Sequence, residues 1–149
     1  MKRLIKVAVI VILVLIILFY PAVVVTNNII ADNVEKELKI YELPENTELV
    51  DSFSLAGKYT GNGNGMQYLG TLLLTSELSR EEIEGHYKER FEYIYVAPQT
   101  GSEPEFIRGS GHHFKKFGND GNYYCVALWG GYIENDRLRE ILDVDLRGH

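Results

Sequence analysis

Residues 7–25 have the sequence VAVIVILVLIILFYPAVVV, a run of 19 residues without a charged side chain. At about 1.5 Å per residue, a helix of this length spans roughly 28 Å, which is close to the thickness of the hydrocarbon core of a bilayer. Pro21 lies near the end of the run, where a kink or an early helix end costs little. The run therefore predicts a transmembrane helix, and the lipid bilayer is the first expected partner, through residues 7–25.

The charges on the two sides of this run predict its orientation. Lys2, Arg3 and Lys6 precede it, and the next basic residue is Lys36. Because basic residues stay on the cytoplasmic side, we expect a cytoplasmic N-terminus and a C-terminal domain outside the cell membrane. A cleaved signal peptide is the alternative, but its apolar region is usually about 7–15 residues long, and no clean A-x-A site follows the run. The sequence favours an uncleaved, single-pass signal-anchor.

The rest of the chain has room for one small domain. Residues 1–25 are interpreted as a cytoplasmic stub and transmembrane anchor, 26–44 as a stalk helix or linker, and 45–149 as the exported domain. Beyond residue 25 the chain has 12 basic and 21 acidic residues, a formal charge of −9. An acidic domain lacks the basic surface that binds phosphates, so nucleic acid is not an expected partner.

Apolar alternation and turn residues predict an α+β domain. Ser79 and Glu82 form a capping box that begins a helix ending near Phe91, and a short last helix is expected over 137–142. The order ββαβββ, then the short C-terminal helix, predicts a small, mainly antiparallel sheet with one helix packed on a face. The five predicted strands cover residues 48–60, 66–76, 93–96, 106–117 and 123–132. The fourth of these strands is expected to contain a bulge near Gly109.

Residues 61–65, with the sequence GNGNG, separate the first two predicted strands. Asn-Gly pairs between two strand patterns are typical of hairpin turns. A phosphate-binding loop would lead from a strand into a helix, and this loop leads into another strand. Since polar hairpin tips often carry contacts, Asn62 and Asn64 are the candidate residues of a contact loop.

A resemblance rests on the residues around this turn. GNGNGMQYLG at 61–70, together with the Leu-Ser-x-Glu-Glu helix start at 78–82, resembles an uncharacterised bacterial family of small proteins with an N-terminal membrane anchor. The similar block covers about half of the exported domain. The resemblance implies a location at the bacterial cell surface, and it implies no activity, cofactor or site residue.

The sequence gives little support for a metal site or a reactive thiol. His112 and His113 are adjacent, and neighbours in a strand point to opposite faces, so they cannot easily bind one ion together. Cys125 is the only cysteine, so no intramolecular disulfide can form, and its apolar surroundings disfavour a thiolate. We therefore expect no metal, no cofactor and no catalytic residue.

Aromatic residues are the main surplus beyond the anchor, with nine tyrosines, five phenylalanines and Trp129. Tyrosine is amphipathic and is enriched at binding surfaces. If Tyr123, Cys125 and Trp129 face the helix, the alternate residues of the last strand line the other face of the sheet. Tyr124 and Tyr132 then become candidates for an aromatic surface. We expect the C-terminal segment or the stalk to cover this face, in preference to a partner.

These features favour a non-catalytic binding or interaction module at the cell envelope, with an envelope protein or a glycan as its partner. A cell-envelope hydrolase acting on carbohydrate or peptide is the alternative function, because paired carboxyl groups can hydrolyse glycosides. The acids of this chain are numerous and scattered, so the sequence marks no particular pair. An enzyme is therefore the less favoured interpretation.

Overall fold

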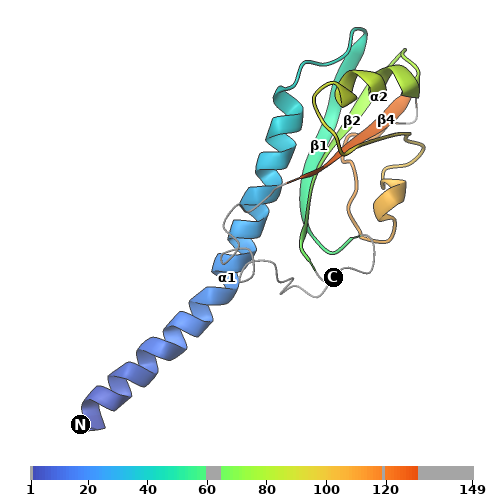
Figure 1. Cartoon of the computed structure of the whole chain (residues 1–149). Coiled ribbons are helices and arrows are strands. Elements are labelled where there is room, and N and C mark those ends of the chain that lie inside the picture. Colours follow the sequence, from blue (N-terminus) through green and yellow to red (C-terminus); the bar gives the residue numbers. More distant parts are fainter. Residues whose placement is uncertain (1, 60–64, 119, 131–149) are drawn as a thin grey trace.

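The computed structural model describes residues 2–59, 65–118 and 120–130 (Figure 1). Four strands form one antiparallel sheet in the order β1-β2-β4-β3, so β2 and β4 are central. This arrangement confirms the predicted α+β class. In chain order the elements are α1 (Lys2–Ile40), β1 (Thr47–Gly57), β2 (Gln67–Ser76), α2 (Arg80–Lys88), β3 (Ile94–Pro98), the 3-10 helix η1 (Glu105–Ile107) and β4 (Tyr123–Gly130).

Helix α1 has two parts with different surroundings (Figure 1). The large apolar side chains at residues 4–20 are each 47–76% exposed, and this part projects away from the sheet. The second part lies along the sheet and buries one face. Among the described residues α1 is the one helix long and apolar enough to cross a membrane, which is compatible with a single-pass anchor. The buried residues of α1 are Val23, Asn27, Ala31, Val34 and Leu38.

The inward face of α1 supplies part of the domain's core. Ala31, Val34 and Leu38 belong to an apolar cluster that also holds side chains from α2 and from all four strands. Their spacing of three and four residues keeps them on one side of the helix. The segment 26–44, expected as a stalk or linker, is thus helical as far as Ile40 and packs against the sheet.

Gly70 in β2 allows α1 to lie close to the sheet. A Cβ atom at this position would lie 2.6 Å from the Cα and N atoms of Glu35, and 2.9 Å from the carbonyl carbon of Val34. Such separations are well below van der Waals contact, so any side chain larger than hydrogen would push the helix away. The helix backbone and the strand backbone are therefore in direct contact at this point.

Polar pairs define the direction in which α1 crosses the sheet. As the residue number rises along α1, the number of its partner in β1 falls, so helix and strand run in opposite directions. Thr47, the first residue of β1, consequently lies at the end of the sheet farthest from the exposed part of α1. The hydrogen-bonded pairs are Asn27–Tyr68, Asp32–Ser54 and Glu35–Ser52.

The other face of the sheet is covered by the chain between β3 and β4. Ile107 and Phe114 are buried on this face, where Cys125 packs beside Phe114. Val126 and Leu128 lie on the opposite side, in the cluster with α1 and α2. The assignment of faces expected for the last strand is therefore wrong, because its odd-numbered residues point away from the helices. The stalk, one of the two expected covers, packs on the same side of the sheet as α2, and the cover of the other face comes from the β3–β4 connection.

Residues 106–117 do not form the predicted strand, and the prediction of five strands is wrong at this segment. Gly109 and Gly111 adopt φ angles of 88° and 77°, which interrupt an extended backbone. A carboxylate replaces a strand partner, because Asp51 Oδ2 accepts the backbone N–H of Lys115 at 2.6 Å and of Lys116 at 3.1 Å. The segment therefore buries apolar side chains without joining the sheet.

The predicted first hairpin and the predicted start of the second helix are confirmed, while α2 ends at Lys88 and not near Phe91. The β1–β2 pairing extends to Gly57 opposite Gln67, as a hairpin requires. The Ser79 hydroxyl accepts the Glu82 N–H, and Glu82 Oε2 accepts the Ser79 N–H at 2.8 Å, which completes the capping box. The Ser79 hydroxyl also lies 2.7 Å from Glu82 Oε2 and donates to it, and this bond, followed by the bond from the Ser79 N–H, lowers the pKa of the Glu82 carboxyl. The residues 60–64, with Asn62 and Asn64, and the helix expected over 137–142 lie outside the described residues.

The close contact at Gly70 predicts an unusual sensitivity to one methyl group. Gly70→Ala should lower the free energy of unfolding by about 1–3 kcal/mol, because the Cβ overlaps the helix backbone. Gly85 in α2 has open space where a Cβ atom would lie, so Gly85→Ala should instead raise stability by about 0.5–1 kcal/mol through helix propensity. Urea unfolding of both variants in detergent checks the pair, and similar effects would contradict the role of Gly70.

The packing of α1 also predicts where a soluble fragment must begin. Residues 23–149 keep the buried face of α1 and should unfold cooperatively. Residues 41–149 lack Ala31, Val34 and Leu38, and the loss of these contacts should cost several kcal/mol, a large share of a typical stability of about 5–15 kcal/mol. Thermal melts followed by circular dichroism compare the two fragments. A cooperative transition in 41–149 would show that the sheet folds without the helix.

Candidate functional site

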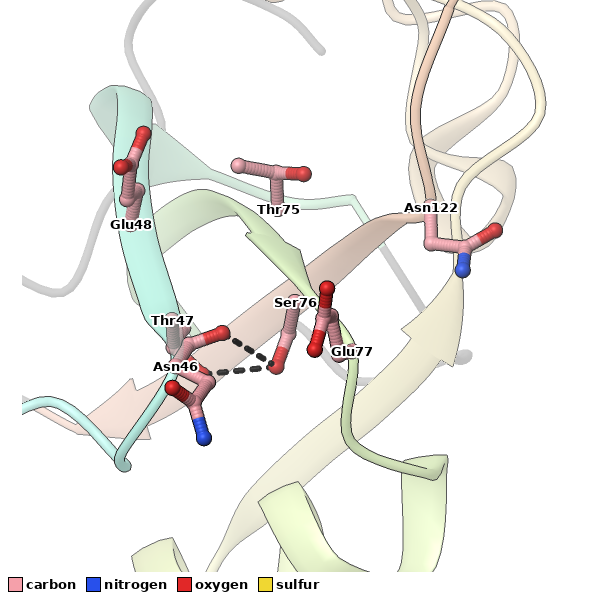
Figure 2. Close-up of a pocket in the computed structure, with 7 residues that line it drawn as sticks. All are labelled: Asn46, Thr47, Glu48, Thr75, Ser76, Glu77 and Asn122. Carbon is pink, nitrogen blue, oxygen red and sulfur yellow. Dashed lines mark hydrogen bonds between the residues drawn. The ribbon is translucent and has the colours of Figure 1, made fainter.

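The end of the sheet farthest from the exposed part of α1 carries a polar pocket of about 590 Å³, here named the distal pocket (Figure 2). Its walls come from the start of β1, the end of β2 and the residue that precedes β4. This volume lies within the roughly 300–1,000 Å³ range of small-molecule sites. The lining residues are Asn46, Thr47, Glu48, Thr75, Ser76, Glu77 and Asn122.

A hydroxyl network forms the base of the distal pocket. Ser76, only 5% exposed, lies with its Oγ 2.7 Å from Thr47 Oγ1, and it donates to the Asn46 carbonyl at 3.4 Å (Figure 2). The same oxygen accepts the Leu78 N–H at 3.1 Å. These contacts use the hydrogen-bonding capacity of the Ser76 hydroxyl. Its role is therefore to join the beginning of β1 to the end of β2.

The chain enters the pocket through a tight turn. Pro44 is buried and ends the connection from α1, and the turn that follows places Asn46 at a φ of 54°. Asparagine tolerates this left-handed conformation better than most residues. Thr47 then begins β1, with its hydroxyl 3.3 Å from the Glu45 carbonyl. The local sequence thus accounts for the position of the pocket's edge.

The distal pocket is lined by polar side chains. Glu48 and Glu77 are exposed, and Figure 2 shows the Glu48 side chain directed away from the Ser76 hydroxyl. Among the described residues that line the pocket, Glu48 and Glu77 are the acids, and none is a histidine. Hydroxyls, amides and carboxylates offer both donors and acceptors to a polar molecule. Sequence analysis did not find this site, because its residues come from separate ends of three strands.

The two adjacent histidines have separate partners. His112 Nε2 lies 3.5 Å from Tyr59 Oη, and His113 Nδ1 lies 3.3 Å from Ser102 Oγ. Both side chains belong to the irregular β3–β4 connection rather than to a strand. Among residues 2–59, 65–118 and 120–130, no group of three or more His, Cys, Asp or Glu side chains is placed to hold a metal ion.

The tyrosines proposed for an aromatic surface fall in different places. Tyr124 is half-buried and packs against the cluster under the helices. Tyr132 lies outside the described residues. The exposed tyrosines of the described chain beyond the anchor are instead Tyr93, 66% exposed, and Tyr95, 36% exposed. The alternation Tyr93-x-Tyr95 before Pro98 was the sequence signal that could have identified them.

The Phe106 ring contacts two other aromatic rings on the face opposite α1. The Phe106 ring in η1 lies 5.1 Å from the Tyr95 ring and 5.9 Å from the Trp129 ring, measured between centroids. Both pairs are close to edge-to-face, a favourable geometry for aromatic rings. Tyr93 precedes β3, and its carbonyl accepts the Trp129 N–H at 3.4 Å. Tyr93, Tyr95, Phe106 and Trp129 are named the aromatic surface below.

Burial of Cys125 makes its thiol a test of the fold. Burial raises the pKa of the Cys125 thiol to about 12, so very little thiolate exists at pH 8. We expect a maleimide to react with the native protein at least about a hundredfold more slowly than with the urea-unfolded protein. Mass spectrometry over time measures both rates. Rapid labelling of the native protein would place Cys125 in an accessible setting.

No protein-family model matches the chain, and neither a curated protein nor a solved structure is similar to it.

Proposed function

We propose that this protein is a membrane-anchored, extracytoplasmic module that binds a component of the cell envelope and catalyses no reaction. One observation carries the proposal. Helix α1 is continuous from Lys2 to Ile40, and its exposed apolar part leads directly into the part that packs on the sheet. A helix of this kind joins a bilayer to a folded domain without a flexible connection.

The continuity of α1 also supports a retained anchor over a cleaved signal peptide. The nearest approach to a cleavage site, Ile29-Ile30-Ala31, lies inside the helix, and Ala31 is buried in the core. Cleavage there would remove Val23 and Asn27, and with Asn27 the buried hydrogen bond from the Tyr68 hydroxyl. Because these residues are buried in the folded domain, their removal would destabilise it, which favours the uncleaved chain.

The charges near the N-terminus and the direction of the helix support the proposed orientation. Lys2, Arg3 and Lys6 favour a cytoplasmic N-terminus. Burial of α1 begins at Val23, before the end of the predicted span, so the domain would lie directly at the membrane surface. The distal pocket is at the opposite end of the sheet and would open toward the cell wall or the extracellular space.

Binding is favoured over hydrolysis by the chemistry of the distal pocket. The Ser76 hydroxyl bridges two strands, and the pocket's carboxylates are exposed to water. Hydrolytic sites usually combine an activated nucleophile or water with an acid held in a water-poor setting. The pocket instead offers several hydroxyl, amide and carboxylate groups that can form hydrogen bonds, which suits recognition of a polar envelope component.

A topology experiment tests this function. We expect a reporter that is active only outside the cytoplasm to be active when fused after His149, with the full-length protein in the membrane fraction. Replacing Lys2, Arg3 and Lys6 by glutamate should reduce the active fraction, since these charges set the orientation. A shortened, soluble product would favour a cleaved signal peptide. Hydrolysis of envelope carbohydrate or peptide that is lost in Glu48→Gln or Glu77→Gln would support the hydrolase instead.

A further inference from the structure

The aromatic surface is held rigidly on one side and open to solvent on the other. Phe106 and Trp129 are half-buried against the apolar cluster of Leu55, Leu69, Ile107 and Ala127. Tyr95 contacts Phe106 from β3 and remains partly exposed. Side chains locked by packing in this way lose little freedom when a ligand binds.

A polar groove of about 390 Å³ adjoins the aromatic surface and shares Phe106 with it. Lys58 and Arg108 offer hydrogen-bond donors there, and Glu105 offers a carboxylate that lies 3.6 Å from the Arg108 guanidinium. Donors and acceptors thus stand side by side next to aromatic faces. The lining residues are Lys58, Tyr59, Glu105, Phe106, Ile107, Arg108, Gly109 and Ser110.

The free edge of β3 does not favour the addition of a partner's strand. The bonds from the Gln99 N–H to Tyr123 and from the Trp129 N–H to Tyr93 show that odd-numbered residues pair with β4. The even-numbered residues therefore face the outer edge, where Pro98 has no N–H to donate. The Val96 carbonyl is already taken by Arg80 Nε at 2.9 Å. This edge is protected in the way that limits strand pairing.

The exposed area of the two tyrosines favours a small ligand over a protein partner. If a tyrosine side chain carries roughly 200 Å², the exposed fractions of Tyr93 and Tyr95 correspond to a total on the order of 200 Å². A stable protein interface buries about 800 Å² on each partner. The aromatic surface matches a narrow ligand that has both an apolar face and many polar groups.

We propose that the aromatic surface and the adjoining groove bind a glycan chain of β-linked pyranose sugars. All-equatorial pyranose rings present C–H groups on their faces and hydroxyls around their edges. The C–H faces stack on Tyr95 and Trp129, while the hydroxyls donate to Glu105 and accept from Arg108. This inference rests on the proposed function, because it requires the domain to lie outside the cytoplasm, where such chains occur.

Trp129 is the only tryptophan, so its fluorescence reports directly on this surface. Purified full-length protein in nanodiscs is titrated with cellotetraose and chitotetraose, and with α-linked maltotetraose for comparison. We expect a saturable change in emission with at least one β-linked probe and a weaker one with maltotetraose. No saturable change with either β-linked probe up to about 10 mM, or equal affinity for maltotetraose, would overturn the proposal.

Variants of the aromatic surface, each paired with a control variant, test where the sugar binds. Tyr95→Ala should weaken binding about three- to tenfold, the effect of losing one aromatic contact, whereas Tyr95→Phe should keep it. Glu105→Gln should weaken binding, whereas Glu89→Gln, an exposed acid after α2, should leave it unchanged. Slow maleimide labelling of Cys125 shows that each variant is folded. Equal binding by Tyr95→Ala and the unchanged protein would place the sugar elsewhere and contradict the proposal.

The outcomes of the sugar titration and of the topology experiment are independent of each other. The titration uses purified protein, so its outcome does not depend on which side of the membrane the domain occupies. If the external reporter is active but no sugar binds, the proposed anchored module stands and the glycan proposal fails. A tryptophan response to a tyrosine-rich peptide, with none to the sugars, would assign the aromatic surface to a protein partner and overturn the glycan.

Discussion

Helix α1 meets β2 at Gly70 with no side chain between the two backbones. A Cβ atom there would overlap Glu35, and the inward residues of α1 around this contact include the small Ala31. Gly130 in β4 lies beside the Val34 side chain, because a Cβ atom there would be 3.4 Å from Val34 Cγ1, an ordinary van der Waals distance. This close approach lets one helix serve as both the apolar projecting rod and a layer of the domain core. The position of every other element relative to α1 depends on it.

A rigid connection of this kind has consequences for binding. A domain on a flexible linker samples many orientations relative to its anchor, whereas a domain that packs on the continuation of the same helix would keep one orientation. The distal pocket lies at one end of the sheet, and the aromatic surface lies on the face opposite α1. The two sites are therefore separate in place and in chemistry. A polar pocket of hydroxyls and carboxylates and a platform of aromatic rings suit different kinds of chemical group.

The second face of the sheet shows how a loop can replace a layer of secondary structure. Residues between β3 and β4 bury Ile107 and Phe114, yet they form no strand. Their backbone groups are satisfied in part by side chains, such as the carboxylate of Asp51 at the irregular pairing in β1. Asp51 appeared in the sequence only as a break in the apolar alternation of the first strand. Its function was decided by a segment more than sixty residues away in the chain.

Local sequence was enough to determine the elements whose signals lie within a few residues. The apolar run at 7–25 predicts a helix, the Asn-Gly pairs predict a hairpin, and Ser79 with Glu82 predicts the start of α2, because each signal acts through neighbouring residues. The face of β4, the irregular path of 106–117 and both candidate sites depended on contacts distant in sequence. Alternation states which residues share a face, but it cannot state which face meets the helix, since both faces of β4 are apolar. Tertiary packing decided that choice: α1 lies against the face of β2 that carries Gly70, and Leu128, the partner of Gly70 in β4, is buried with the helices.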